Sequence, residues 1–156
     1  MATQLSRNFS LEELCKSQTA ERRGIDNSLD PARDAQIVAN LRRVCEEILQ
    51  PTRDHFDVPI VPSSGYRCLE LNRAIGSKDT SQHVNGEAVD FEVPGIANAD
   101  LAAWIESNLD YDQLILEFYM PGQPNSGWVH CSITGGENRH VALTINRDGV
   151  TEGLLA

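Results

Sequence analysis

At Ser81–Phe91 the sequence reads SQHVNGEAVDF, a short turn that runs into an apolar segment. The apolar segment indicates a buried strand, which has little structural use for the ionisable residues His83 and Asp90 at its mouth. Gly86 allows the chain to double back, so His83 would lie in the loop while Asp90 points inward from the strand. A neutral imidazole and a carboxylate are both good zinc ligands, and a catalytic zinc takes three protein ligands plus an open position for water.

The third ligand would come from a second strand-like segment, which reads WVHCSI at residues 128–133. His130 lies inside this segment, where a histidine has no obvious packing role. Side chains alternate along a strand, so His130 would share one face with Trp128 and Ser132. The two segments together therefore predict a zinc site that combines His130 with the histidine and the aspartate of the turn.

The chain has the length and the composition of a single globular domain, residues 1–156. Hydrophobic residues make up 40% and charged residues 23%, which is ordinary for a soluble protein. No apolar run approaches the length that spans a bilayer, and the first seven residues lack the apolar core of a signal peptide. We therefore expect a protein that is synthesised in the cytoplasm and is not exported by the signal-peptide route. We also expect the protein to be a monomer.

The formal net charge of the chain is −10 at pH 7. Such a charge argues against a nucleic-acid partner, because nucleic-acid phosphates require a basic surface. It also argues against electrostatic binding to a membrane or to another anionic polymer. The charge itself does not identify a substrate.

The longest helical pattern opens at Asp30-Pro31, with Asp30 as the cap and Pro31 in the first turn. Apolar residues recur at helical spacing from position 37 to position 49, and they mark a stripe that faces the core. We expect Gln50-Pro51 to end or kink this helix, because proline lacks the backbone N–H that a helix interior requires.

Shorter elements surround this helix. Ser10 and Glu13 form a capping box for a first helix, and a polar link then leads through Gly24. Residues 59–62 read as a short strand bracketed by prolines, which favours a sheet edge. A short helix is expected over residues 68–75.

Strand patterns dominate the second half of the chain. Besides the strand that carries Asp90, they cover residues 113–119, 128–133 and 140–145, and Asn98 would cap a helix that precedes them. Helices therefore come mainly first and strands mainly second. This order favours an α+β domain with helices and a central, mostly antiparallel sheet that carries the zinc site.

The strand half contains four polar groups in apolar surroundings: His83, Asp90, Glu117 and His130. Each has an ordinary structural explanation, since a buried histidine is more often a hydrogen-bonded core residue and a strand glutamate can face solvent. Burying several ionisable groups without a metal or other partners is costly, however. The four together therefore favour a functional site.

Three motifs resemble those of the zinc D-Ala-D-Ala carboxypeptidases and related peptidoglycan peptidases, in the superfamily that also contains the hedgehog signalling domain. They are the segment SSGYR at residues 63–67, the SxHxxGxAxD pattern at residues 81–90, and WVH at residues 128–130. The resemblance extends from about residue 9 to residue 133. It implies that His83, Asp90 and His130 bind Zn²⁺, in the fold expected above.

The resemblance also implies roles for Arg67 and Ser81. Arg67 matches the arginine that orients a substrate carboxylate or stabilises the oxyanion, and a surface arginine is the alternative. Ser81 lies where the family has a serine that binds substrate or supports the metal ligands, and a plain loop hydroxyl is the alternative.

The catalytic base is less directly marked. Several relatives carry an acidic residue three positions before the last ligand, but this chain has Gly127 there. Glu117 is the nearest carboxylate with a suitable setting, because an antiparallel neighbour strand could bring it close to His130. We therefore predict that Glu117 is the base. Glu87 is the alternative, although strand alternation directs it away from the face of Asp90.

By resemblance, the chain is expected to be a zinc metallopeptidase that hydrolyses a peptide bond in bacterial cell-wall stem peptides. The cut bond would be a D-Ala-D-Ala end or a bond inside the peptide, and the short domain is similar to phage lysis enzymes, which act on the wall after release from the cytoplasm. A bacterial enzyme is the alternative origin. The alternative function is a non-enzymatic domain of the same fold, either zinc-binding or a structural part of a virion.

Overall fold

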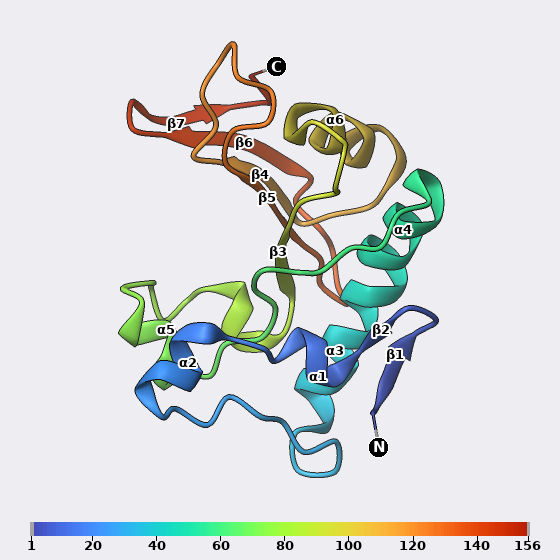
Figure 1. Cartoon of the computed structure of the whole chain (residues 1–156), viewed down its shortest axis with the longest axis vertical. Helices are drawn as coiled ribbons and strands as arrows, with labels where there is room; N and C mark the ends of the chain where they lie inside the picture. Colours follow the sequence, from blue (N-terminus) through green and yellow to red (C-terminus); the bar gives the residue numbers. More distant parts are fainter. Residues whose placement is uncertain (1, 156) are drawn as a thin grey trace.

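A five-stranded sheet forms the C-terminal half of the structure, a computed structural model that describes residues 2–155 (Figure 1). Its strand order is β3-β5-β4-β6-β7, and only the β4–β6 pair of this sheet is parallel. The strands are β3 (Ala88–Phe91), β4 (Gln113–Glu117), β5 (Trp128–Ser132), β6 (Val141–Asn146) and β7 (Gly149–Glu152). The predicted α+β class with a mostly antiparallel sheet is therefore confirmed, and β7 is an additional strand.

The two faces of this sheet differ in character, as strand alternation requires. One face is apolar, because Leu114 and Leu116 of β4 lie opposite Cys131 and Val129 of β5, and all four are fully buried. Helix α6 (Asn98–Asn108) packs against β4 and β5 and contributes to the same core. The opposite face carries the polar residues Asp90 of β3, His130 of β5 and Glu117 of β4, so it is the face available for a site.

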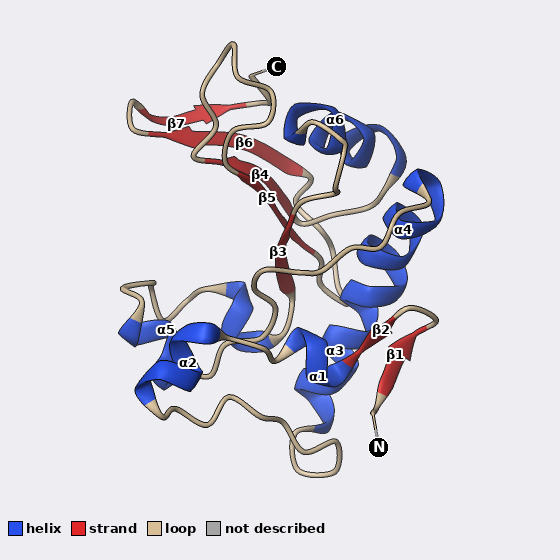
Figure 2. Ribbon diagram, in the orientation of Figure 1, coloured by secondary structure: helices blue, strands red, loops and turns tan. Residues whose placement is uncertain are grey.

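The N-terminal half is mainly helical and lies below and to the right of the sheet in the view of Figure 2. A two-stranded antiparallel hairpin that the sequence did not predict precedes the helices. These elements are β1 (Gln4–Ser6), β2 (Phe9–Ser10), α1 (Leu11–Leu14), α2 (Gln18–Arg23), α3 (Ala35–Val44), a π-helical segment (Cys45–Leu49), α4 (Gln50–Phe56) and α5 (Leu69–Ala74). Ser10 caps α1 as predicted, and its side chain accepts a hydrogen bond from the backbone N–H of Glu13.

The longest helix begins later than the sequence pattern indicated. Asp30 caps a preceding turn, since its side chain accepts hydrogen bonds from the backbone N–H groups of Ala32 and Arg33. Regular α3 starts only at Ala35, after Asp34. The helix also continues through Pro51, because the chain inserts a π-helical segment just before it and Pro51 falls in the first turn of α4.

Three further predictions about local structure were wrong. Residues 18–23 form helix α2 instead of a polar link, with Ser17 capping its start and Gly24 in the left-handed region at its end. Residues 59–62 form no strand, and the sheet contact in this region is a single bridge between Ser64 and Asp90. Asn98 is the first residue of α6, not its cap.

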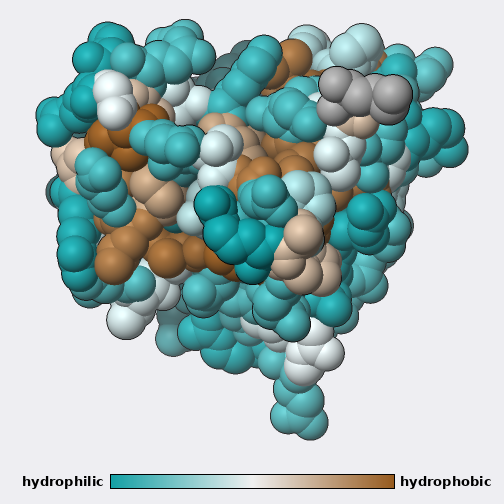
Figure 3. All heavy atoms as spheres, turned by 90° about the horizontal axis from the view of Figure 1, so that it is seen from below, coloured by the Kyte–Doolittle hydropathy of each residue, from teal (hydrophilic) through white to brown (hydrophobic). Residues whose placement is uncertain are grey.

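The lower face of the molecule is mainly hydrophilic, and apolar side chains show chiefly in the hollows between polar ones (Figure 3). Within residues 2–155, no helix is both long enough and apolar enough to cross a membrane. The hydrophobic core joins the helices of the first half to the apolar face of the sheet. The opposite face of β3, β5 and β4 therefore meets the loops around residues 63–67 and 81–86 at the junction of the two halves.

Candidate functional site

A tight turn between residues 81 and 86 positions His83 at this junction. Gln82–Asn85 form one 3₁₀ turn, and the Ser81 side chain caps it by accepting a hydrogen bond from the backbone N–H of His83. Gly86 ends the turn at φ +73°, a conformation that favours glycine. A Cβ atom at this position would also approach a backbone oxygen and a methyl group of Ile37 to 2.9 Å, so the turn requires glycine for two separate reasons.

The imidazole of His83 is oriented by the loop that precedes α5. Its Nδ1 atom donates to the carbonyl oxygen of Gly65 at 2.7 Å, which leaves Nε2 directed at Asp90 with an Nε2–Oδ1 distance of 3.3 Å. The ring is 2% exposed, and this burial lowers the pKa of His83 more than Asp90 raises it. His83 is therefore held neutral with one nitrogen free, the form in which histidine binds metals.

The pairing of β3 with β5 brings the other two predicted ligands together. Asp90 lies directly opposite His130 in this antiparallel pair, and His130 Nδ1 donates to Asp90 Oδ1 at 2.8 Å. Burial would raise the pKa of Asp90, but the hydrogen bond from His130 and the adjacent imidazole of His83 outweigh that effect and hold the pKa well below its usual range. Asp90 is thus a carboxylate at neutral pH, between two imidazoles.

The three side chains form a donor set that could hold a metal ion. One donor atom from each of His83, Asp90 and His130 lies within 4.8 Å of the other two. Donor atoms around a tetrahedral zinc stand about 3.3 Å apart, given Zn–N and Zn–O distances of about 2.0–2.1 Å. The separations of Asp90 Oδ1 from His83 Nε2 and His130 Nδ1, 3.3 Å and 2.8 Å, are near this spacing. Metal binding would require His130 Nδ1 to give up the proton that it now donates to Asp90. The residues present therefore fit zinc.

Glu117 lies on the same face of the sheet as this donor set. It pairs with Trp128 across β4 and β5, while Ile115 pairs with His130, so all four side chains point to one side. Burial raises the pKa of Glu117, an effect moderated by His130 and Arg67 and strengthened by Asp90. The half-buried Glu117 carboxylate is thus placed within electrostatic reach of the proposed ligands.

The backbone explains why position 127 is not acidic. Gly127 has φ +66°, and a Cβ atom there would lie 1.8 Å from the carbonyl oxygen of Glu117. No side chain can occupy that position unless the strands separate. The only acidic residue that β4 and β5 contribute is therefore Glu117.

Glu87, the alternative base, has a different environment. Strand alternation places it with Val89, on the face opposite to Asp90. Burial raises the pKa of Glu87 as well, but its charged neighbours are Asp112 and Arg43, not the histidines of the donor set. The geometry thus separates Glu87 from the donor set and brings Glu117 to it.

Arg67 approaches the site from the loop before α5. Its backbone N–H donates to the carbonyl oxygen of His83 at 3.1 Å, and its guanidinium makes a long contact of 3.5 Å with the Ser81 hydroxyl. Burial lowers the pKa of Arg67, although the charges of Asp90 and Glu117 oppose this shift. Its Nε atom is buried and has no hydrogen-bond partner among the described residues. Arg67 therefore retains an unused donor close to the donor set.

Three positioning residues had not been singled out from the sequence as parts of the site. Gly65 accepts the His83 hydrogen bond, and a Cβ atom there would come within 2.5 Å of the carbonyl oxygen of Leu14. Ser64 exchanges backbone hydrogen bonds with Asp90. The buried Asn27 side chain bonds to Tyr66 O and Cys68 N, on either side of Arg67. The SSGYR motif marks the first two, but no local pattern marks Asn27.

Comparison with known proteins assigns the family. A family model described as Peptidase M15 matches residues 7–132, which is most of the chain and includes every predicted site residue. The chain belongs to the peptidase M15 family. No individual curated protein matches it. The resemblance noted from the motifs is therefore confirmed. Members of this family are zinc metallopeptidases, and His83, Asp90 and His130 could hold such a metal ion in this chain.

Proposed function

We propose that this M15 peptidase is a zinc enzyme that hydrolyses a peptide bond in the stem peptides of the bacterial cell wall. The observation that carries the proposal is the convergence of His83, Asp90 and His130 on the same sheet face as Glu117. A buried structural site would have no need for an additional carboxylate. A hydrolytic site needs one to handle a proton.

In the proposed assignment, His83, Asp90 and His130 hold the zinc. Bound zinc would supply a water of lowered pKa and a Lewis acid for the scissile carbonyl. The Gly65 carbonyl fixes the His83 tautomer, and the sheet register fixes Asp90 against His130. These contacts set the ligand orientations before any metal is bound, which limits the reorganisation that binding requires.

Glu117 is assigned the role of general base. Its carboxylate would accept a proton from the attacking water and pass it to the leaving amine. The raised pKa suits the first step, because a carboxylate whose pKa lies closer to neutrality is a stronger base toward the attacking water. Arg67 would bind a substrate carboxylate through its planar guanidinium or stabilise the developing oxyanion. Ser81, as the cap of the His83 turn, would support both His83 and Arg67.

Two adjoining pockets are consistent with an extended peptide substrate. One of about 620 Å³ and one of about 500 Å³ both include Val61 and Ser63 in their walls. The backbone N–H of Ser63 donates to the carbonyl oxygen of Asp90 at 2.9 Å, so the shared wall lies directly beside a proposed metal ligand. A peptide bound across the shared wall would have room on both sides of it.

The proposal is tested by digesting purified muropeptides with the zinc-loaded protein and analysing the products by mass spectrometry. Loss of a terminal alanine would indicate a D-Ala-D-Ala carboxypeptidase, and separation of cross-linked or internal fragments would indicate an endopeptidase. Lysis of intact cell walls would support the proposed role as a phage lysis enzyme. A zinc-loaded protein that cleaves none of these substrates would favour the non-enzymatic alternative.

A further inference from the structure

The charged residues that line the larger of the two pockets are all basic, although the chain as a whole is acidic. Its charged lining residues are Lys16, Arg22 and Arg67, and no carboxylate lines it. The chain as a whole carries 23 acidic and 13 basic residues. A pocket whose only charged lining residues are cations therefore differs from the average surface of this chain, and it favours an anionic ligand.

Two of these cations have donors to spare. The Nε atom of Arg67 is buried without a partner. Arg22 contacts only the Thr19 hydroxyl, at a long 3.4 Å, and forms no ion pair with a carboxylate of residues 2–155. Other arginines of the chain do form such pairs, for example Arg73 with Asp79 and Arg139 with Asp112. Arg22 and Arg67 are thus available to a ligand.

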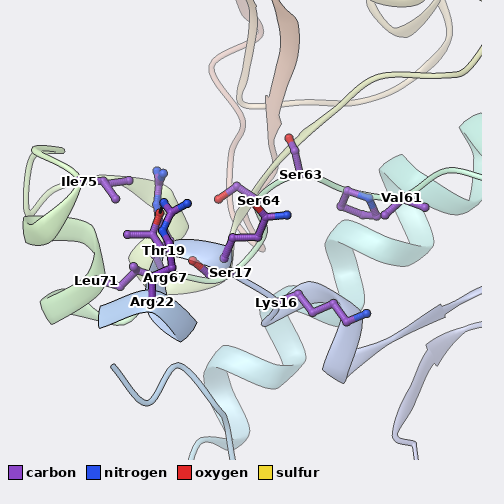
Figure 4. A pocket seen from close by; sticks show the side chains of 12 residues that line it. Lys16, Ser17, Thr19, Arg22, Val61, Ser63, Ser64, Arg67, Leu71 and Ile75 are labelled. Carbon is purple, nitrogen blue, oxygen red and sulfur yellow. Dashed lines mark hydrogen bonds between the residues drawn. The ribbon is translucent and has the colours of Figure 1, made fainter. Parts of the chain in front are cut away.

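The helix that carries Arg22 is fixed at both ends. Ser17 caps the start of α2 by accepting a hydrogen bond from the backbone N–H of Ala20 at 3.1 Å, and Gly24 ends it in the left-handed region. In Figure 4, Arg22 and Arg67 lie at the same end of the pocket, whereas Lys16 extends away from them. Arg22 is therefore the residue of α2 best placed to act with Arg67.

The pocket shares Arg67 with the proposed active site and adjoins it through the segment Ser63–Ser64. Ser63 and Ser64, which line it, are hydrogen-bonded through their backbones to Asp90. Its other walls include the apolar residues Val61, Leu71 and Ile75. A peptide side chain in this pocket would have both apolar walls and guanidinium groups beside it.

We propose that Arg22 is a specificity-determining residue that binds a carboxylate of the substrate peptide in this pocket, in addition to the group bound by Arg67. This inference rests on the proposed peptidase function. The carboxylate is either the C-terminal carboxylate of the peptide or a side-chain carboxylate, since both present the same two oxygens to a guanidinium.

The test measures peptide binding to the metal-free protein, so that no cleavage interferes. A synthetic stem peptide is titrated by calorimetry in three forms: with all carboxylates free, with the C-terminus amidated, and with the side-chain carboxylates amidated. Arg22→Gln should weaken binding of the free-carboxylate form about tenfold, as expected for one partly exposed charge-assisted contact. It should leave unchanged the binding of whichever amidated form lacks the relevant carboxylate.

Arg23→Gln is the matched control, because Arg23 is the neighbouring exposed arginine of α2 and does not line the pocket. It should bind all three forms as the parent does. Equal weakening by Arg23→Gln, equal weakening of every peptide form by Arg22→Gln, or no binding of any form by the parent would each overturn the inference.

The same proteins loaded with zinc separate this inference from the proposed function. If binding follows the predicted pattern but no peptide is cleaved, the carboxylate subsite stands and the peptidase proposal fails. If peptides are cleaved and Arg22→Gln changes neither binding nor KM, the peptidase proposal stands and the role of Arg22 is rejected.

Discussion

Glu117 lies near charged residues of the proposed active site. The charges of His130, Asp90 and Arg67 all act on its carboxylate, and burial has the largest effect on its pKa. Glu87 has its pKa raised by burial too, but on the other face of the sheet. Both glutamates therefore have a pKa raised by burial, but only Glu117 has the charges of the donor set beside it.

Glu117→Gln should retain the fold and the zinc, because the change is nearly isosteric, and should lower kcat/KM by about 10²–10⁴-fold. The parent should lose kcat/KM as the pH falls, since a base must be deprotonated to act, and this acidic limb should lie above the pKa of an ordinary glutamate. The measurement is a pH–rate profile of each variant with zinc content determined in parallel. The limb should vanish in Glu117→Gln and persist in Glu87→Gln, and the reverse result would make Glu87 the base.

Arg67→Lys tests the need for a planar guanidinium. Lysine keeps the positive charge but cannot form two parallel hydrogen bonds to a carboxylate, so kcat/KM should fall roughly 10–100-fold, as for loss of one charge-assisted hydrogen bond. Zinc content and melting temperature should be unchanged. Arg73→Lys, at an exposed arginine paired with Asp79, should behave as the parent. Normal turnover in Arg67→Lys would reject a role in substrate binding.

The turn that carries His83 is restricted by its own backbone conformation and also by helix α3, which packs against it. Gly86 and Gly76 both have positive φ angles, +73° and +80°. A Cβ atom on Gly86 would press on the backbone oxygen of Ile37 in α3, whereas a Cβ atom on Gly76 would meet nothing within 4 Å. The sequence pattern indicates why each turn needs glycine, but only Gly86 is also restricted by a packed neighbour.

Gly86→Ala should therefore destabilise the protein more than Gly76→Ala. Both substitutions should lower the free energy of unfolding by about 1–2 kcal/mol through the left-handed backbone. Gly86→Ala should lose a further ~1–3 kcal/mol from overpacking against α3, and it should weaken zinc retention because His83 moves with the turn. Urea denaturation measures the first effect and metal analysis the second. Equal destabilisation of the two variants would show that α3 adjusts to the added methyl group without a further loss of stability.

At the scale of the whole molecule, the donor set links stability to zinc and to pH. Its three members come from the loop before β3, from β3 and from β5, so only the folded chain assembles them. Burial lowers the pKa of His83 below its value in an unfolded chain, and the unfolded state therefore binds more protons than the native state in the interval between the two pKa values. Stability of the metal-free protein should fall as the pH drops below about 6.5, the ordinary histidine pKa.

Zinc at about 1,000 times its dissociation constant should stabilise the parent by about 4 kcal/mol, and the gain should shrink at acidic pH because the ligands must be deprotonated. Melting temperatures with zinc and with a chelator, from pH 8 to pH 5, measure both effects. His83→Ala should bind no stoichiometric zinc and show no gain. His140→Ala, at an exposed histidine that pairs with Asp110, should keep both. Stoichiometric zinc in His83→Ala would remove His83 from the site.

The sequence by itself determined the class of the fold and the three residues that could form a metal site. The spacing of His83, Gly86 and Asp90 is a local property, because a turn and the strand after it depend on neighbouring residues. The periodicity of apolar residues likewise indicates which residues of one element share a face. The order of helical and strand patterns along the chain indicates the fold class. These features were predicted correctly, whereas local patterns failed for α2 and for the start of α3, where short polar segments carry little periodicity.

Only the tertiary structure decided which residues meet around that site. Asp90 faces His130, 40 positions away, through the register of β3 with β5, and Glu117 joins them through the register of β4 with β5. Gly127 leaves no room for a side chain because the Glu117 carbonyl lies against it. Arg22 reaches the Arg67 pocket because α2 packs beside that loop. Such contacts depend on how elements pack, and residues far apart in the chain carry no local signal of a packing that forms only when the whole core is buried.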